Sequence, residues 1–376
     1  MLQNRKQFMP DTNNMSIPAD KSIISNLLPL RAVKRKFMRN LFFIFSLFLS
    51  VSTGFAADVE LKNNHPQKYV VQKGDTLWGI SGKFLKSPWL WPNVWYANPQ
   101  VKNPHLIYPG DSITLVYIDG KPQLRIDRGR PHVKLTPSGR VVALNRPIPT
   151  IGLAAIRPFL TKHQIVDKNT LKKSPYILRA VGERLITGTG DKVYVRGHKS
   201  DKHSDFLVVR KGQVYSDPHT KEILGYEAKY VGDSRMIRYG DPATHYLSNT
   251  SREVLIGDRL LKFDHAAYND NFVPHAPKAD VKGHIIAVME GVTQIGQHQV
   301  VVINKGKRDG MEVGHVLAIY QKGKKVEDTV RKSKAVQLPD ERAGLLMVFR
   351  TFDKLSYALI MKATTNMHVL DAVVNP

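Results

Sequence analysis

The clearest pattern of apolar and polar positions lies in residues 69–116, where it predicts a small unit of mixed strand and helix. A short apolar strand at 69–71 precedes a polar turn, and Asp75 and Thr76 at the end of this turn are suited to cap a helix. The next apolar residues recur at the spacing of one helical face: Leu77, Ile80, Phe84 and Leu85. We therefore expect a strand, a turn and an amphipathic helix in that order.

The second half of this unit predicts another helix, over about 88–97, and a closing strand at 112–116 after a Pro-Gly-Asp turn. Trp91 and Trp95 lie one helical turn apart, and we expect both in the core because so small a unit has few other large apolar groups. Trp89 and Tyr108 are expected on its surface. The whole unit reads as strand–helix–helix–strand.

From residue 117 onward the pattern changes to short apolar runs separated by Gly, Asp and Pro, which is typical of strands. Three pairs of segments match in the same order: Phe206–Gly212 with Val316–Gly323, Ile223–Ala228 with Arg342–Met347, and Val254–Leu260 with His368–Val373. We interpret them as two divergent copies of one β module. Chance alignment of Gly-punctuated strands is the alternative interpretation.

The predicted fold class is therefore multidomain, with a small α/β domain at 69–116 followed by mainly-β tandem modules. The modules are expected at 176–262 and 283–376, joined by a linker at 263–282 that is rich in Ala, Pro and Asn. Residues 117–175 are expected to form an extended connecting region. Within it, Pro131, Pro137, Pro147 and Pro149 disfavour helix around 133–149.

The N-terminal region carries the three parts of a secretory signal. A basic run at 34–40 precedes an apolar core at 41–51, and the small residues Gly54 and Ala56 follow at the −3 and −1 positions of a cleavage site. The core is shorter than the ~20 residues that a membrane-spanning helix needs. We expect an N-terminal extension and cleaved signal at 1–56, with Met38 as an alternative start and an uncleaved anchor as an alternative outcome. A polar linker follows at 57–68.

Composition narrows the function classes. The chain has 56 Lys and Arg against 32 Asp and Glu, a formal charge of +24, which favours polyanionic surroundings such as nucleic acid, anionic lipid or a wall polymer. An exported protein rarely meets nucleic acid, so the signal disfavours that partner. The chain has no cysteine, which excludes a disulfide scaffold, a thiolate zinc site and a cysteine nucleophile.

Familiar catalytic motifs of wall enzymes are also missing from the sequence. No histidine is followed by glutamate, so His-Glu-x-x-His does not occur, and no serine has lysine three positions later. A lytic transglycosylase needs only one glutamate, but such an enzyme would normally have a helical catalytic domain. We therefore expect no enzyme activity, no cofactor and no metal site.

The motifs of the first unit, Tyr69–Leu77 with Ile80 and then Leu106–Asp111 with Ile113, resemble those of a lysin-motif (LysM) domain. The resemblance implies binding of N-acetylglucosamine-containing glycans, chiefly peptidoglycan. In that family the sugar lies between the first strand–helix loop and the second helix–strand loop. Carried onto this chain, the implied glycan-binding residues are Gly74, Asp75, Thr76 and Leu77 on one side and Asn103, His105, Leu106 and Ile107 on the other.

Further motifs at Val301–Gly314, Leu338–Gly344 and Leu355–Ala358 resemble the C-terminal domain of a flagellar outer-ring assembly protein. An exported LysM domain followed by this module is similar to the type IV pilus secretin-associated family. The resemblance implies a periplasmic, non-catalytic adaptor that anchors an outer-membrane secretin to peptidoglycan. The alternative is a cell-wall hydrolase, or a regulator of one, targeted by its LysM domain.

Overall fold

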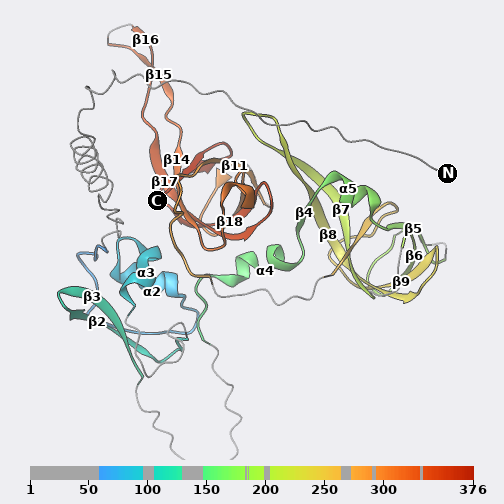
Figure 1. The fold of residues 1–376 in the computed structure, drawn as a ribbon, viewed down its shortest axis with the longest axis horizontal. Helices are drawn as coiled ribbons and strands as arrows, with labels where there is room; N and C mark the ends of the chain where they lie inside the picture. Colours follow the sequence, from blue (N-terminus) through green and yellow to red (C-terminus); the bar gives the residue numbers. More distant parts are fainter. Residues whose placement is uncertain are drawn as a thin grey trace, which may run out of the picture. The chain divides into compact units, whose positions relative to one another are not determined.

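The computed structural model describes residues 59–95, 106–128, 147–182, 184, 186–198, 204–263, 272–289, 294–330 and 333–376 (Figure 1). All of them belong to one compact unit, Val59–Pro376. The predicted signal at 1–56 lies outside the described residues, as do Asn103 and His105 of the predicted glycan site. Within the described ranges, no helix is both long and apolar enough to cross a membrane.

The N-terminal domain has the predicted strand–helix–helix–strand layout. Strand β1 (Lys68–Val70) leads to helix α2 (Leu77–Phe84), and a short 3-10 turn η1 (Pro88–Leu90) continues into helix α3 (Trp91–Val94). Ser87 precedes η1, and Pro88 occupies its first position, where a backbone N–H would have no partner within the helix.

The N-terminal sheet is larger than the sequence pattern indicated. Strand β2 (Ser112–Ile118) pairs with β1 and continues through a tight turn into β3 (Lys121–Asp127), so the sheet has the order β1-β2-β3. The turn at Asp119 and Gly120 has positive φ at both residues, the conformation that suits a two-residue hairpin. The core beneath contains Phe84, Trp91 and Ile107, all with 0% exposure.

The stretch 117–175, expected to be extended, contains two short helices besides the end of the hairpin. Helix α4 (Leu153–Thr161) is followed by strand β4 (Gln164–Val166) and helix α5 (Lys168–Lys173). The Asp167 carboxylate caps α5 by accepting a hydrogen bond from the Thr170 N–H at 2.8 Å. Helix α4 forms although Pro158 lies within it, and it spans only nine residues.

The rest of the described chain is mainly β, as predicted. The first sheet contains β5 (Tyr176–Ala180), β6 (Lys192–Arg196), β7 (Asp205–Ser216), β8 (Ile223–Arg238), β9 (Ala243–Thr250) and β10 (Arg259–Lys262). Its order is β4-β8-β7-β10-β5-β6-β9, and an additional β8–β9 pairing joins six of these strands into a ring.

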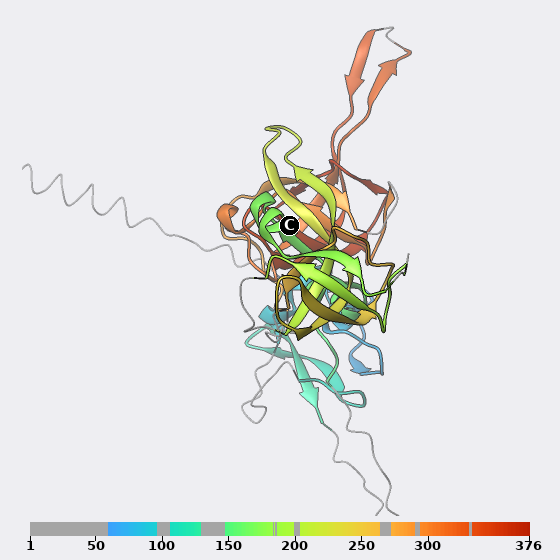
Figure 2. The same cartoon turned by 90° about the vertical axis from the view of Figure 1, so that its right-hand side faces the viewer.

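The second sheet is a closed barrel of order β11-β13-β18-β17-β14-β20. Its strands are β11 (Lys282–Val288), β13 (Val300–Ile303), β14 (Val316–Gln321), β17 (Glu341–Thr351), β18 (Ser356–Ala363) and β20 (Ala372–Val374). Three smaller elements surround it: the pair β12 (Gln294–Ile295) and β19 (Met367–His368), the 3-10 turn η2 (Lys307–Asp309), and the hairpin β15 (Lys325–Asp328) with β16 (Ser333–Gln337). This hairpin projects from the barrel (Figure 2).

The two rings share one strand order. Around the first ring the strands follow in the order β5, β6, β9, β8, β7, β10, and around the barrel in the order β11, β13, β18, β17, β14, β20. If the six strands of each ring are numbered along the chain, both orders are 1-2-5-4-3-6. The segments Phe206–Gly212 and Val316–Gly323 begin in the third strand of their rings, β7 and β14. The segments Ile223–Ala228 and Arg342–Met347 lie in the fourth strands, β8 and β17.

Ion pairs and hydrogen bonds connect the first ring and α4 to the barrel. Glu222, at the tip of the β7–β8 hairpin, receives two 2.8 Å hydrogen bonds from Arg308 and one of 2.7 Å from Lys354. Arg350 of β17 donates to main-chain carbonyls at the end of α4, including Phe159 O at 2.6 Å. A cation at a helix C-terminus satisfies carbonyls that have no partner within the helix.

Candidate functional site

The first loop of the predicted glycan groove is a rigid turn. The Asp75 carboxylate accepts hydrogen bonds from the Gln72 N–H at 2.8 Å and the Tyr69 hydroxyl at 2.9 Å. Gly74 has a φ of +96°, a conformation that other residues adopt only with strain. Thr76 caps α2, because its hydroxyl accepts from the Gly79 N–H at 3.0 Å. These hydrogen bonds therefore fix the conformation of the loop.

The second loop is described only from Leu106 onward. Leu106 is 37% exposed, whereas the side chain of Ile107 is completely buried. Tyr108 N–H donates to the Asp111 carboxylate at 3.0 Å, and the Arg128 guanidinium donates to Leu106 O at 2.6 Å. Asn103 and His105, predicted for this side of the groove, lie outside the described residues.

A later segment of the chain, residues 147–150, lies between these two loops. Its Ile148 N–H donates to Ile107 O at 2.8 Å, while Leu77 N–H donates to Pro149 O and Trp78 N–H to Thr150 O, both at 3.0 Å. The amides of Leu77 and Trp78 belong to the first turn of α2, where no partner exists within the helix. They are the donors that a ligand carbonyl would need, and in this structure the protein's own backbone supplies the acceptors.

The apolar side chains of the groove are covered as well. Leu77 is 2% exposed, and it belongs with Ile107 and Ile148 to the core of the N-terminal domain. Leu77 and Ile107 are the apolar residues of the implied glycan site that could accept the methyl of an N-acetyl group. With the segment 147–150 in this position, that contact requires the segment to move.

The tryptophans of α2 and η1 belong to a different apolar cluster. Trp78 and Trp89 are 8% and 9% exposed and share this cluster with Ile151 and with Ile156 and Phe159 of α4. The expectation that Trp89 forms an exposed stacking surface is therefore wrong, because the connecting region covers it. Trp91 is fully buried in the domain core, in line with the sequence argument.

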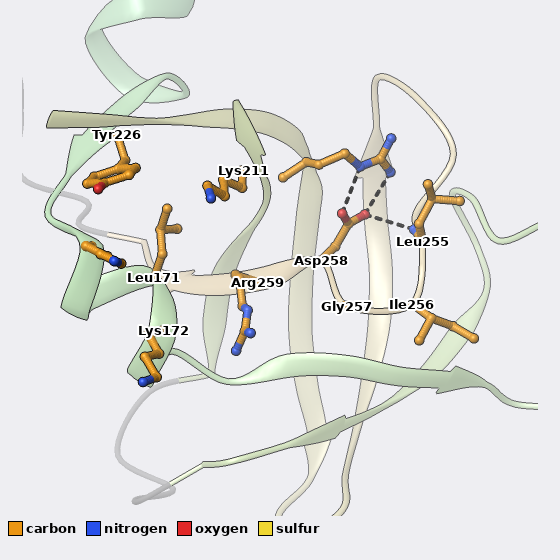
Figure 3. A pocket seen from close by; sticks show the side chains of 11 residues that line it. Leu171, Lys172, Lys211, Tyr226, Leu255, Ile256, Gly257, Asp258 and Arg259 are labelled. Atoms are coloured by element: carbon orange, nitrogen blue, oxygen red, sulfur yellow. Dashed lines mark hydrogen bonds and ion pairs between the residues drawn. The ribbon is translucent and has the colours of Figure 1, made fainter. Parts of the chain in front are cut away.

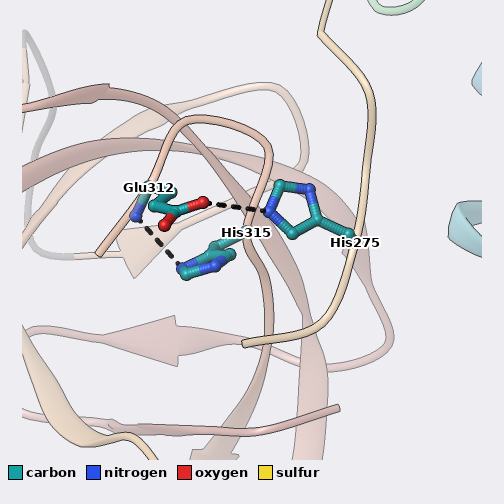
Figure 4. Close-up of side chains that lie close together, drawn as sticks. All are labelled: His275, Glu312 and His315. Carbon is teal, nitrogen blue, oxygen red and sulfur yellow. Dashed lines mark hydrogen bonds and ion pairs between the residues drawn. The ribbon is translucent and has the colours of Figure 1, made fainter. Parts of the chain in front are cut away.

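One group of potential metal ligands occurs among the described residues. His275, Glu312 and His315 bring one ligand atom each to within 4.8 Å of one another (Figure 4). His275 Nε2 lies 3.8 Å from a Glu312 carboxylate oxygen. His315 Nδ1, however, accepts a hydrogen bond from the Glu312 main-chain N–H at 3.2 Å, so its lone pair is already engaged. Burial lowers the pKa of His315, as does the adjacent His275.

Tetrahedral zinc, with bonds of about 2.0–2.2 Å, needs donor atoms roughly 3.3–3.6 Å apart. The three donors of this group would have to approach one another and release the Glu312 amide. We therefore assign no metal to the group.

The geometry of the N-terminal domain agrees with the comparisons. The family model described as LysM domain matches residues 69–116. The uncharacterized protein YqbP of Bacillus subtilis (strain 168) is 33% identical over 60 residues, a match that covers 13% of this chain and 27% of that protein. The similarity thus spans little more than a quarter of that relative and concerns a domain rather than the whole protein. Residues 69–116 form a LysM domain, and LysM domains are non-catalytic domains that bind peptidoglycan or related carbohydrates.

Proposed function

We propose that this chain is a periplasmic, non-catalytic adaptor that binds peptidoglycan through its LysM domain and an outer-membrane secretin, of a type IV pilus system, through its β modules. The LysM domain at 69–116 is the observation that carries the proposal. Two rings of the same strand order follow it, and we assign the binding of the protein partner to them. The secretin and the pilus rest on the family resemblance of the sequence motifs.

Glycan binding in the predicted groove involves release of the segment 147–150. While Pro149 O and Thr150 O accept from the first turn of α2, the amides of Leu77 and Trp78 are not open to an acetamido carbonyl. Once the segment leaves, the amides of Leu77 and Trp78 point toward the same space, and Leu77 and Ile107 present an apolar surface. The free energy of release lowers the apparent affinity of each domain for the sugar.

Weak individual binding suits a tether that works in many copies. A secretin is a ring of subunits, and a ring of adaptors would engage one wall at many points. Linked binding events raise overall avidity by ~10²–10⁴ without any new contact. The net positive charge of the chain adds a salt-sensitive attraction to wall carboxylates.

Co-sedimentation of the mature chain with purified peptidoglycan tests the proposal. Salt of about 0.5 M suppresses the general charge attraction. Leu106→Asp places a charge at the exposed edge of the groove, and Leu338→Asp, at a residue of similar exposure (43% against 37%), is the matched control. We expect the wild type and the control to sediment with the wall and Leu106→Asp to remain in solution.

Two results would overturn the adaptor. Absence of co-sedimentation of the wild type removes wall binding, and release of soluble muropeptides during incubation indicates a hydrolase. If Leu106→Asp sediments as well as the control, wall binding lies outside the predicted groove.

A further inference from the structure

A cationic pocket of about 480 Å³ lies in the first ring, between helix α5 and the loop that precedes β10 (Figure 3). Five cationic side chains from three elements line it: Lys168, Lys172, Arg210, Lys211 and Arg259. One carboxylate, that of Asp258, lines it too. A volume of this size is typical of a ligand pocket.

The single carboxylate does not neutralise the pocket. Asp258 is buried and receives hydrogen bonds from Arg210 Nε and Nη2 at 2.8 and 2.9 Å and from the Leu255 N–H at 2.8 Å. Its charge is thus balanced by Arg210 alone. Among the described residues, Lys168, Lys172 and Lys211 form no ion pair.

Arg259 adds a fourth cation without a carboxylate partner in the described structure. It stacks over Tyr176 with 5.2 Å between guanidinium carbon and ring centroid, and it donates to Ser174 O at 3.2 Å. These contacts fix its position and leave its charge unpaired. Four positive charges therefore line one hollow, and their combined field favours an anionic ligand.

The pocket also has apolar walls. Leu171 and Tyr226 are buried at its base, where they pack in one cluster with Leu207 and Val209. The Lys211 ammonium lies 5.8 Å from the centroid of the Tyr226 ring. At the rim, Leu255 is 44% and Ile256 is 74% exposed. Large apolar side chains next to unpaired cations suit a ligand that is both acidic and apolar.

We propose that this pocket binds an acidic peptide segment that carries at least one apolar side chain. Lysines on flexible stems act as separate point charges and suit several carboxylates at different positions. A phosphate group would favour an open helix N-terminus, but Asp167 already caps α5. The hollow between a helix and a loop also fits a chain segment better than it fits a flat lipid surface. The inference is independent of wall binding by the LysM domain.

Fluorescence anisotropy with the mature chain tests the pocket. The probe is a fluorescein-labelled hexapeptide, Glu-Leu-Glu-Glu-Leu-Glu, in about 50 mM salt, where screening is weak. The double variant Lys172→Glu with Lys211→Glu reverses two pocket charges, and Lys324→Glu with Lys325→Glu reverses two charges beside and on β15. We expect the pocket variant to lose affinity ~10-fold or more and the control to change less than about 2-fold.

The apolar walls give a second readout. Ile256→Ser, at an exposed position that does not support the core, should weaken binding several-fold even at about 0.5 M salt, where charge reversal matters less. Equal losses in the pocket and control variants would overturn the site in favour of general charge attraction. Absence of peptide binding would overturn it too, and so would pocket-dependent binding of phosphatidylglycerol vesicles without peptide binding, which would identify a membrane surface.

Discussion

Displacing the segment 147–150 should increase glycan binding by the LysM domain. Ile148 is 6% exposed, and its N–H bonds to Ile107 O at 2.8 Å. Ile148→Asp puts a carboxylate into this apolar position, which is costly unless the segment leaves the groove. The amides of Leu77 and Trp78 then lose their internal acceptors and become open to a ligand.

The magnitude follows from the contacts that hold the segment closed and from the one that the substitution removes. Three backbone hydrogen bonds contribute about 0.5–1.5 kcal/mol each, and burial of one isoleucine about 1.5–3 kcal/mol. Loss of the Ile148 side chain alone therefore shifts the open–closed equilibrium by roughly 10- to 100-fold. The apparent affinity rises by the same factor until the open form predominates.

Isothermal titration with the pentamer of N-acetylglucosamine measures this change. Ile186→Asp is the matched control, since it makes the same substitution at a residue with 75% exposure in the first ring. Tryptophan fluorescence during thermal unfolding verifies that both variants are folded. An affinity of folded Ile148→Asp that is equal to or lower than that of the control would refute the reasoning.

Three further predictions concern stability. Arg308 and Lys354 lower the pKa of Glu222 to about 2 from 4.5, so its contribution to folding stability is present above pH 4.5 and is lost as the pH falls toward 2. Over this range the Tm of Glu222→Gln should therefore fall less than the Tm of the wild type. Burial, together with the adjacent His198, lowers the pKa of His245 to about 3 from 6.5. As the pH drops from 6.5 toward 3, the unfolded chain is protonated at His245 before the folded chain, so stability falls. His245→Gln should flatten this part of the curve of Tm against pH, and an unchanged slope would show that His245 does not cause it. Gly306→Ala would place a Cβ 2.4 Å from Asp353 O, so the free energy of unfolding measured in urea should fall by about 1–3 kcal/mol. Gly296→Ala, where the added Cβ meets open space, should leave the free energy of unfolding almost unchanged.

The N-terminal layout was predictable because its signals are local. Gly74 at a turn with positive φ and Thr76 as a cap act within a few residues, and the helix face that follows is continuous in the sequence. The occupation of the groove was not predictable. Residues 147–150 return to it from some forty residues beyond Ile107, and no periodicity records such a contact.

The cationic pocket could not be predicted from the sequence for the same physical reason. Its lysines and arginines come from α5, β7 and β10, which are far apart along the chain and become neighbours only through the ring order. In the sequence each looks like an ordinary solvated cation.

Closure of the second barrel restricts how another protein chain can attach to it. Each of its six strands has a hydrogen-bonded neighbour on both sides, and β20 lies between β11 and β14. A partner that binds by adding a strand to an exposed sheet edge therefore finds no free edge strand in this barrel. The two-stranded β15–β16 hairpin does have open edges, and Lys325 on β15 is the kind of residue that discourages indiscriminate pairing there.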